Sequence, residues 1–240
     1  MRPIFLGIIV WGMLLGACST VKDVVAPTPP DVPSLAALGS KKGQPIRSHF
    51  DHLGHPVLSH PLTVTVREIP FDKASFQTYA KRAKEDGKSV EVTYIDSLKT
   101  KPTYIQMAVE DKIVLRNLLN NEDNKKVRSY LEKDGSKGIV TQLSFYMDPM
   151  EASQLLGVQK LELCHDSKKG MALMAQVNGQ KTLFDLRYAT VFQYELNGFC
   201  WGEDLYGRPR IETINEGGAC PKGLERKAAK LDREKSYLKL

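Results

Sequence analysis

The sequence predicts an α+β fold, in which one domain contains a largely antiparallel sheet and several short helices. Alternating runs rich in β-branched residues, which are typical of strands, follow one another along the chain. The helical patterns between them are short and scattered, without the regular strand–helix alternation of a parallel sheet. About 180 residues carry these patterns, which is enough for one well-buried core. We expect a signal peptide and a disordered tether before this domain.

The chain begins with a short basic segment, an apolar run and small residues, in the order MRPIFLGIIVWGMLLGACST. Arg2 is the only charged residue before Lys22. The apolar run has about 12 residues, fewer than the roughly 20 that a membrane-spanning helix needs. This pattern is typical of an export signal, which we place at residues 1–17.

The end of this signal, Leu15-Gly16-Ala17-Cys18, resembles the lipobox of bacterial lipoproteins. The resemblance implies cleavage before Cys18 and acylation of that residue with a diacylglycerol and a further fatty acid such as palmitate. Several acyl chains give stable membrane anchoring, which one chain would not. Ser19, where an aspartate would retain the protein in the inner membrane, implies sorting to the outer membrane of a Gram-negative bacterium. We therefore expect an exported protein that is anchored to the cell envelope.

Residues 18–60 are predicted to form a tether between the lipid and the folded domain. Seven prolines occur from Pro27 to Pro61, and the apolar residues show no sustained period. A flexible chain of this length has an end-to-end distance of roughly 35 Å, which lifts a domain off the membrane surface. The domain itself is predicted at residues 61–240.

The first half of the predicted domain contains three strands and three helices. Alternation of β-branched or aromatic residues indicates the strands, which are 62–68, 89–95 and 102–109. Apolar residues three to four positions apart indicate the helices, which are 73–86, 111–120 and 124–133. Asp72 is placed as the N-cap of the first helix, and Gly87 ends it.

The second half of the predicted domain is richer in strands. Strands are expected at 138–147, 158–164, 171–177, 180–188 and 192–201, with a short helix at 149–157. The dipeptide Asn178-Gly179 is the strongest local signal, because it favours a tight hairpin turn between two strands. A basic helix is expected at 222–236, with Leu224, Ala228 and Leu231 on its apolar face.

Three cysteines remain once Cys18 carries lipid. Cys200 and Cys220 flank a glycine-rich stretch, and we predict that they form a disulfide, which an oxidising compartment allows. A loop of that size would gain roughly 3 kcal/mol in the chain-entropy model. Cys164 lies in an alternating apolar run and is expected to be a buried free thiol. Pairing of Cys164 with Cys200 or Cys220 is the alternative that the sequence leaves open.

The formal net charge of +6 does not describe the domain itself. Residues 61–221 contain 22 basic and 22 acidic side chains, whereas the tail from Lys222 contains seven basic and three acidic ones. The charge is therefore concentrated in the terminal helix, whose ordinary interpretation is a solvated face. An exported lipoprotein with a neutral domain is not expected to bind nucleic acid.

The sequence contains none of the common catalytic signatures, such as G-x-S-x-G, H-E-x-x-H or a glycine-rich phosphate loop, and we assign no catalytic residue. The segment between the two paired cysteines is the candidate recognition surface, because aromatic and arginine side chains make good contact anchors. Its candidate binding residues are Trp201, Tyr206, Arg208 and Arg210. The competing interpretation is that its aromatic residues belong to the core.

Four of the five histidines fall within the run HFDHLGHPVLSH. Imidazole nitrogens bind zinc or copper, so a weak metal site is an alternative function for this tract. The prolines of the run prevent a continuous helix, and the spacing does not fix a ligand geometry. Otherwise we expect no cofactor. The four candidate metal ligands are His49, His52, His55 and His60.

These features favour a membrane-anchored cell-envelope lipoprotein that acts as a non-catalytic binding or structural component. Its expected partners are the membrane, through the lipid anchor, and another envelope macromolecule. A lipid-anchored envelope hydrolase with a carboxylate site is the first alternative, since carboxylate-only catalysis leaves little trace in one sequence. Weak metal binding through the histidine tract is the second.

Overall fold

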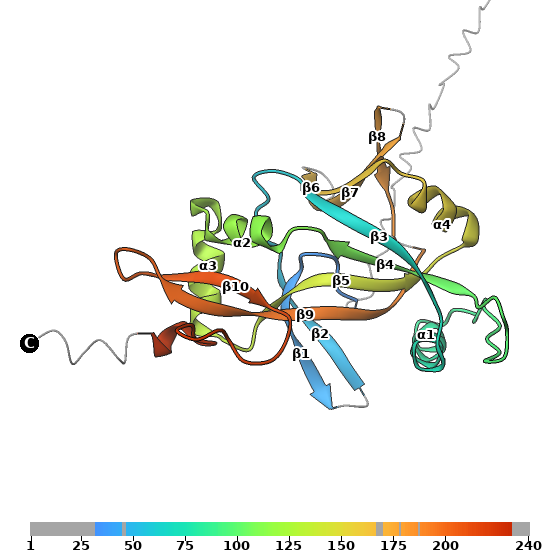
Figure 1. The fold of residues 1–240 in the computed structure, drawn as a ribbon, viewed down its shortest axis with the longest axis horizontal. Coiled ribbons are helices and arrows are strands. Elements are labelled where there is room, and N and C mark those ends of the chain that lie inside the picture. Colours follow the sequence, from blue (N-terminus) through green and yellow to red (C-terminus); the bar gives the residue numbers. More distant parts are fainter. Residues whose placement is uncertain (1–31, 45–46, 167–169, 178, 187, 232–240) are drawn as a thin grey trace, which may run out of the picture.

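The computed structural model describes residues 32–44, 47–166, 170–177, 179–186 and 188–231 (Figure 1). Its strands are β1 Leu38–Gln44, β2 Arg47–Gly54, β3 Leu62–Pro70, β4 Thr103–Val109, β5 Gly138–Tyr146, β6 Lys160–Asp166, β7 Gly170–Val177, β8 Gln180–Phe184, β9 Thr190–Glu203 and β10 Pro209–Asn215. Its helices are α1 Lys73–Glu85, α2 Lys112–Asn120, α3 Lys125–Lys133 and α4 Pro149–Leu156, with single 3₁₀ turns η1 Glu122–Asn124 and η2 Ala228–Lys230. The predicted α+β class is confirmed.

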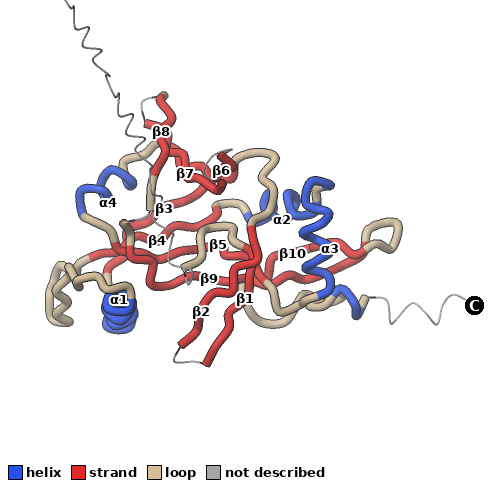
Figure 2. The backbone as a smooth tube through the Cα atoms, turned by 180° about the vertical axis from the view of Figure 1, so that it is seen from behind, coloured by secondary structure: helices blue, strands red, loops and turns tan. Residues whose placement is uncertain are grey.

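The ten strands form one sheet in the order β10-β9-β5-β4-β3-β6-β7-β8, and β1 pairs with β2 and with the start of β5. Every pairing between these strands is antiparallel. The long β9 joins two regions, because its first part pairs with β5 and its last part pairs with β10. The β1–β2 hairpin extends away from the sheet in both views of the backbone (Figures 1 and 2).

Two apolar clusters hold the sheet and its helices together. The larger one packs the inner face of the central strands against α2 and α3, and it includes the fully buried Trp201, Leu115 and Leu118. The smaller one lies between α1 and β9 and is mostly aromatic, with Phe71, Tyr79 and Phe192 at its centre. Aromatic rings of this kind bury large apolar areas, which explains how a single amphipathic helix is held to the sheet.

Several local predictions are confirmed by the hydrogen bonds of the structure. Asp72 caps α1, since its carboxylate accepts from the backbone N–H of Ser75 at 2.7 Å, and Ser75 returns a bond in a capping box. The β7–β8 hairpin turns at the predicted place, where Val177 pairs with Gln180 and Gly179 has φ +79°. A positive φ of this size is the conformation that glycine adopts without steric cost.

The predicted boundary between tether and domain is wrong. Residues 32–44 and 47–60 belong to the folded domain, with β1, β2 and a short buried segment before them. Leu35, Ala36, Ala37 and Leu38 are at most 2% exposed, and Ala36 donates its N–H to the Val140 carbonyl of β5 at 2.8 Å. The leader, Cys18 and the first part of the predicted tether lie outside the described residues.

Two predicted elements take a different form. Residues 89–95 were expected to be a strand, but they cross the end of α1 as irregular chain, with Val92 packed into the aromatic cluster. The described part of the predicted C-terminal helix, 222–231, contains only the 3₁₀ turn η2. Here Trp201 and Glu225 exchange backbone hydrogen bonds of 2.7 and 2.9 Å, and this pairing requires extended rather than helical chain at Glu225.

Candidate binding surfaces

The turn that joins β9 to β10 is organised by one carboxylate. Asp204 Oδ1 accepts hydrogen bonds from the backbone N–H groups of Tyr206 at 2.8 Å and Arg208 at 2.9 Å. Its Oδ2 lies 3.0 Å from Nε of Arg208. The pKa of Asp204 is held below its usual value, mainly by the hydrogen bond from the Arg208 backbone. The hydrogen bond from the Tyr206 backbone and the pairing with the Arg208 guanidinium lower this pKa as well. The turn is therefore ordered in the isolated domain.

This turn presents two large side chains to solvent. Leu205 is 101% exposed and Tyr206 is 81% exposed, and the Arg208 guanidinium lies over the Tyr206 ring at 5.0 Å. Arg210 stands one strand residue further on, paired with Glu212 at 3.0 Å. We call residues 204–208 the hairpin tip. Of the four predicted binding residues, Tyr206 and Arg208 belong to this tip.

Trp201 does not belong to a surface. It is 1% exposed and is among the largest fully buried side chains of the main cluster, so its predicted role as a contact residue is wrong. Trp201 and Cys200 point to opposite faces of β9 and are both buried. The main cluster covers the side of Trp201, and the segment that carries Cys220 covers the side of Cys200. The alternation of the sequence could not reveal that double coverage.

Cys200 and Cys220 form the predicted disulfide, with a Cα–Cα distance of 5.7 Å. The alternative pairings are thereby excluded, and Cys164 is a half-buried thiol on β6 that is outside the disulfide. Its Sγ lies 3.6 Å from the Ala172 carbonyl of β7. The disulfide links the middle of β9 to the segment after β10, so it closes the base of the hairpin whose other end is the tip.

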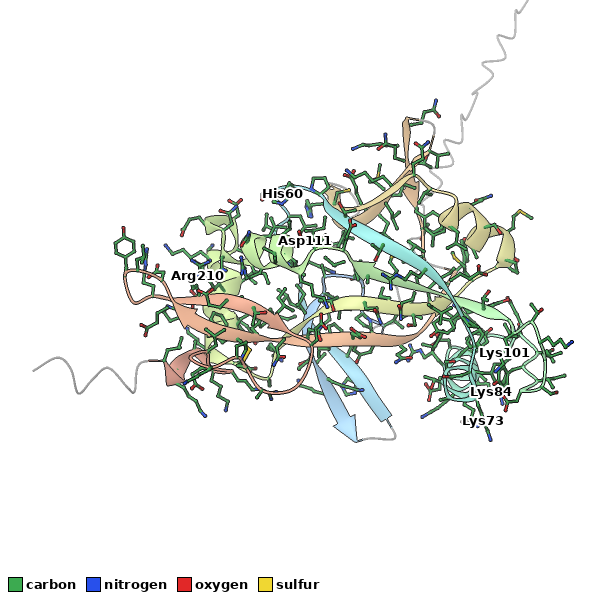
Figure 3. All side chains as sticks on the ribbon, in the orientation of Figure 1. His60, Lys73, Lys84, Lys101, Asp111 and Arg210 are labelled. Atoms are coloured by element: carbon green, nitrogen blue, oxygen red, sulfur yellow. A yellow bond between two sulfur atoms is a disulfide. The ribbon has the colours of Figure 1, made fainter. Side chains whose placement is uncertain are left out.

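A groove of about 1070 Å³ lies across the outer, polar face of the sheet. Its floor is a row of residues in register on four strands, where Thr65 of β3 is opposite Ala108, Ala108 opposite Gln142, and Gln142 opposite Glu195 of β9. One wall is the start of α2, and His60 and Asp111, which are labelled in Figure 3, also line the groove. The sequence contained one signal for this surface, because the polar residues of the alternating run LTVTVRE face the groove.

Charged side chains of the groove are mostly acidic. Four carboxylates line it against Arg67 and Lys112. Asp111 caps α2 through the N–H groups of Ile113 and Val114, and Lys112 pairs with Glu216. Glu195 accepts a hydrogen bond of 3.0 Å from the Gln142 amide. The fourth carboxylate, Glu110, stands at the end of β4. With His60 neutral, the lining has a formal net charge of −2, from two cationic and four anionic groups.

The predicted metal ligands are distributed over different surfaces. The rings of His52 and His55 lie 5.0 Å apart, whereas His60 lines the groove and His49 lies on the opposite face of β2 from His52. Among the residues that the structure describes, no three His, Cys, Asp or Glu side chains are grouped as metal ligands. The His52–His55 pair is thus what the structure offers of the predicted tract.

His55 has a defined structural role. Its Nε2 lies 2.6 Å from the Ser34 hydroxyl, which ties the segment before β1 to the chain after β2. Burial, and to a smaller extent the nearby His52 and His165, lower the pKa of His55 from 6.5 to about 4. The neutral imidazole is therefore the form that fits the folded state.

We expect His55 to make the domain less stable as the pH falls from 6.5 to 4. In that window the unfolded chain binds a proton at His55 and the folded chain does not, so stability is lost on acidification and the loss is complete near pH 4. After discounting for partial exposure, the loss is about 1–2 kcal/mol. Urea unfolding at pH 7 and pH 4 measures it. His55→Gln is expected to reduce the loss of stability between pH 7 and pH 4 by that amount. His49→Gln, at an exposed residue, is expected to leave the loss unchanged. Equal losses in the unmodified protein and both variants would contradict the role of His55.

Comparisons with protein families, with curated proteins and with solved structures found no match to this chain. In the part of the chain that the structure describes, no helix is both long and apolar enough to cross a membrane.

Proposed function

We propose that the protein is a lipid-anchored component of the cell envelope, in the outer membrane of a Gram-negative bacterium, that binds another envelope macromolecule without catalysis. The anchor is supported by the lipobox-like Leu15-Gly16-Ala17-Cys18 at the end of an export signal. The binding role is carried by one observation, the groove across the outer face of the sheet. A surface of this kind, formed by four strands, is rigid and preformed, which lowers the cost of binding.

The chemistry of the groove favours an extended polypeptide segment with basic residues. Its floor offers hydroxyl and amide groups from Thr65, Gln106 and Gln142, which can bond a peptide backbone in either polarity. The surplus of carboxylates over cations complements lysine and arginine side chains. A segment that crosses the floor would meet Glu195 at one end and the start of α2 at the other.

The hydrolase alternative gains no specific support from the same surface. Three of the four groove carboxylates already act in the fold, as a helix cap, an ion-pair partner and an amide acceptor. A general acid needs a carboxyl whose pKa is raised by burial. Burial does raise the pKa of Glu132, but that side chain belongs to α3 and does not line the groove. Metal binding at His52 and His55 remains the weaker alternative.

Replacement of Cys18 by serine is expected to abolish acylation, because the diacylglycerol is transferred to a thiol. Cells that express Cys18→Ser and are fed a labelled fatty acid should contain unprocessed precursor without label. Cys164→Ser is the matched control, since that half-buried thiol is outside the disulfide and lies within the domain. Normal labelling of Cys18→Ser would refute the anchor.

Photo-cross-linking in intact cells tests the groove. A photoreactive residue at Gln106, on the groove floor, is expected to give a protein adduct, whereas one at the exposed Gln154 of α4 is not. The double substitution Glu110→Lys with Glu195→Lys should lower the Gln106 adduct about tenfold, because it reverses the charge that attracts a basic segment. An adduct of unchanged yield in that variant would contradict the proposed ligand class.

A further inference from the structure

The hairpin tip has the properties of a membrane contact. Leu205 and Tyr206 are the two most exposed large apolar side chains that the structure describes, and they are adjacent in sequence. The β9–β10 hairpin extends past α2 and α3 at one end of the molecule in both backbone views (Figures 1 and 2). A convex tip of this kind reaches a flat surface before the rest of the domain does. Scattered single apolar side chains are ordinary on protein surfaces, but a pair at the apex of a projecting hairpin is not.

Most of the backbone N–H groups of the tip already have partners within the tip. The N–H groups of Tyr206 and Arg208 bond to the Asp204 carboxylate, and Gly207 donates to the Asp204 carbonyl at 3.0 Å. Asp204 in turn donates to the Arg208 carbonyl at 2.9 Å. Chain that enters the apolar part of a bilayer must bond internally, because no water is present there to replace a lost partner. The tip can therefore move from water into a bilayer interface without breaking these bonds.

The charges of the tip also suit an interface. The Asp204 carboxylate is paired with Arg208, so the turn is close to neutral, and the same guanidinium covers the Tyr206 ring. Tyrosine and arginine place an apolar body in the membrane and a polar end among the headgroups. Arg210 and Glu212 follow as an ion pair on β10, where the hairpin would leave the headgroup region.

We propose that Leu205 and Tyr206 insert into the phospholipid interface of the membrane that holds the lipid anchor, so that the hairpin tip is a second membrane contact that orients the domain. This proposal rests on the anchored function proposed above. Insertion of one leucine and one tyrosine contributes only a few kcal/mol, which is too little to hold a free protein on a membrane. An anchored domain needs no more than this, since its tether keeps the tip at a high local concentration beside the bilayer.

The internally bonded N–H groups and the Asp204–Arg208 ion pair favour a bilayer over a protein pocket as the occupant. A pocket on a partner protein could supply its own donors and acceptors, so a tip made for it would not need to bond all of these groups internally. The exposed leucine at the apex also has no specific geometry to match. The partner proposed for the groove then binds on the sheet face, at a place that the tip leaves free.

Tryptophan fluorescence in vesicles tests the insertion. The sequence contains two tryptophans, of which Trp11 lies in the leader and Trp201 is 1% exposed, so a new tryptophan at the surface is easily distinguished. Leu205→Trp is compared with Met150→Trp, a substitution of a 72% exposed residue on α4. Each mature acylated protein is reconstituted in phosphatidylethanolamine–phosphatidylglycerol vesicles that contain a brominated phospholipid. We expect Leu205→Trp emission to be quenched at least about threefold more than Met150→Trp emission, because only inserted indole meets the bromine.

A second arm separates this proposal from the proposed anchor. Residues 19–240 carry an N-terminal hexahistidine tag that binds a nickel-chelating lipid in the same vesicles, so the domain is held at the membrane without acylation. Quenching of Leu205→Trp in this arm supports the tip even if mass spectrometry finds Cys18 unacylated, in which case only the anchor fails. Absence of selective quenching in both arms overturns the proposal. Emission that shifts to the blue only in native envelope vesicles, without quenching by lipid, indicates a protein pocket and also overturns it.

Discussion

A chain that begins at residue 61 is expected not to fold, whereas a chain that begins at residue 32 is expected to fold normally. The shorter chain would lack Leu35, Leu38, Phe50 and Leu58, which are between 1% and 8% exposed in the structure. Loss of one large core side chain costs about 2–5 kcal/mol, and a domain has about 5–15 kcal/mol of stability in total. Four such losses, together with the loss of the β1–β5 pairing, exceed that margin.

Circular dichroism and thermal unfolding of the two chains measure this effect. The chain from residue 32 should show a single cooperative transition and a native near-ultraviolet spectrum, and the chain from residue 61 should show neither. If residues 32–60 were a tether, as composition predicts, the two chains would unfold within a few degrees of each other. That outcome would return the domain boundary to residue 61.

The sequence could not reveal this boundary because the contacts that define it are distant along the chain. Leu38 pairs with Ile139, about a hundred residues away, and the short run from Leu35 to Leu38 has no period of its own. Seven prolines around it are typical of a tether, although Pro56 is in fact buried. Local signals were sufficient elsewhere. The Asp72 cap, the turn between β7 and β8 at Gly179 and the alternation of β3 depend on residues close together in the sequence, and each is found where it was predicted.

The same difference between local and long-range contacts decides which residues of the candidate surfaces the sequence could predict. The sequence predicts Tyr206 and Arg208 as surface residues, since a glycine-containing turn must lie outside the core. It leaves Trp201 open between a contact residue and a core residue, because the main cluster that buries Trp201 is assembled from distant parts of the chain. The groove depends on residues that are still further apart in the sequence, because its floor is formed by four strands between residues 65 and 195. Only the polar half of the β3 alternation indicated that this face is solvated.

Asn124→Ala is expected to destabilise the domain by about 3–5 kcal/mol. Asn124 is 0% exposed, and its side-chain amide forms two hydrogen bonds with the backbone of Val57. The Val57 N–H donates to Oδ1 at 2.7 Å, and Nδ2 donates to the Val57 carbonyl at 2.8 Å. We call this pair of bonds the Asn124 clamp. The same Nδ2 bonds the Leu118 carbonyl at the end of α2 at 2.9 Å. Alanine would leave the Leu118 carbonyl without this partner in a buried site and the two Val57 groups without theirs in a partly buried one. Each loss costs about 1–3 kcal/mol, and the partly exposed groups are at the lower end of this range. Urea unfolding measures the change.

Asn121→Ala is the matched control, because Asn121 is exposed and its side chain accepts the N–H of Glu122 at 3.1 Å. Its loss is expected to cost at most about 1 kcal/mol, as for a helix cap. The Val57 side chain is 49% exposed, so apolar burial does not hold this part of the chain in place. The Asn124 amide does so instead, and hydrogen exchange at the Val57 amide distinguishes this clamp from general loss of stability. In Asn124→Ala the Val57 amide should exchange faster than global unfolding allows. If it exchanges only as fast as the amides of the core strands, Asn124 stabilises α2 alone, and other contacts hold the segment before β3.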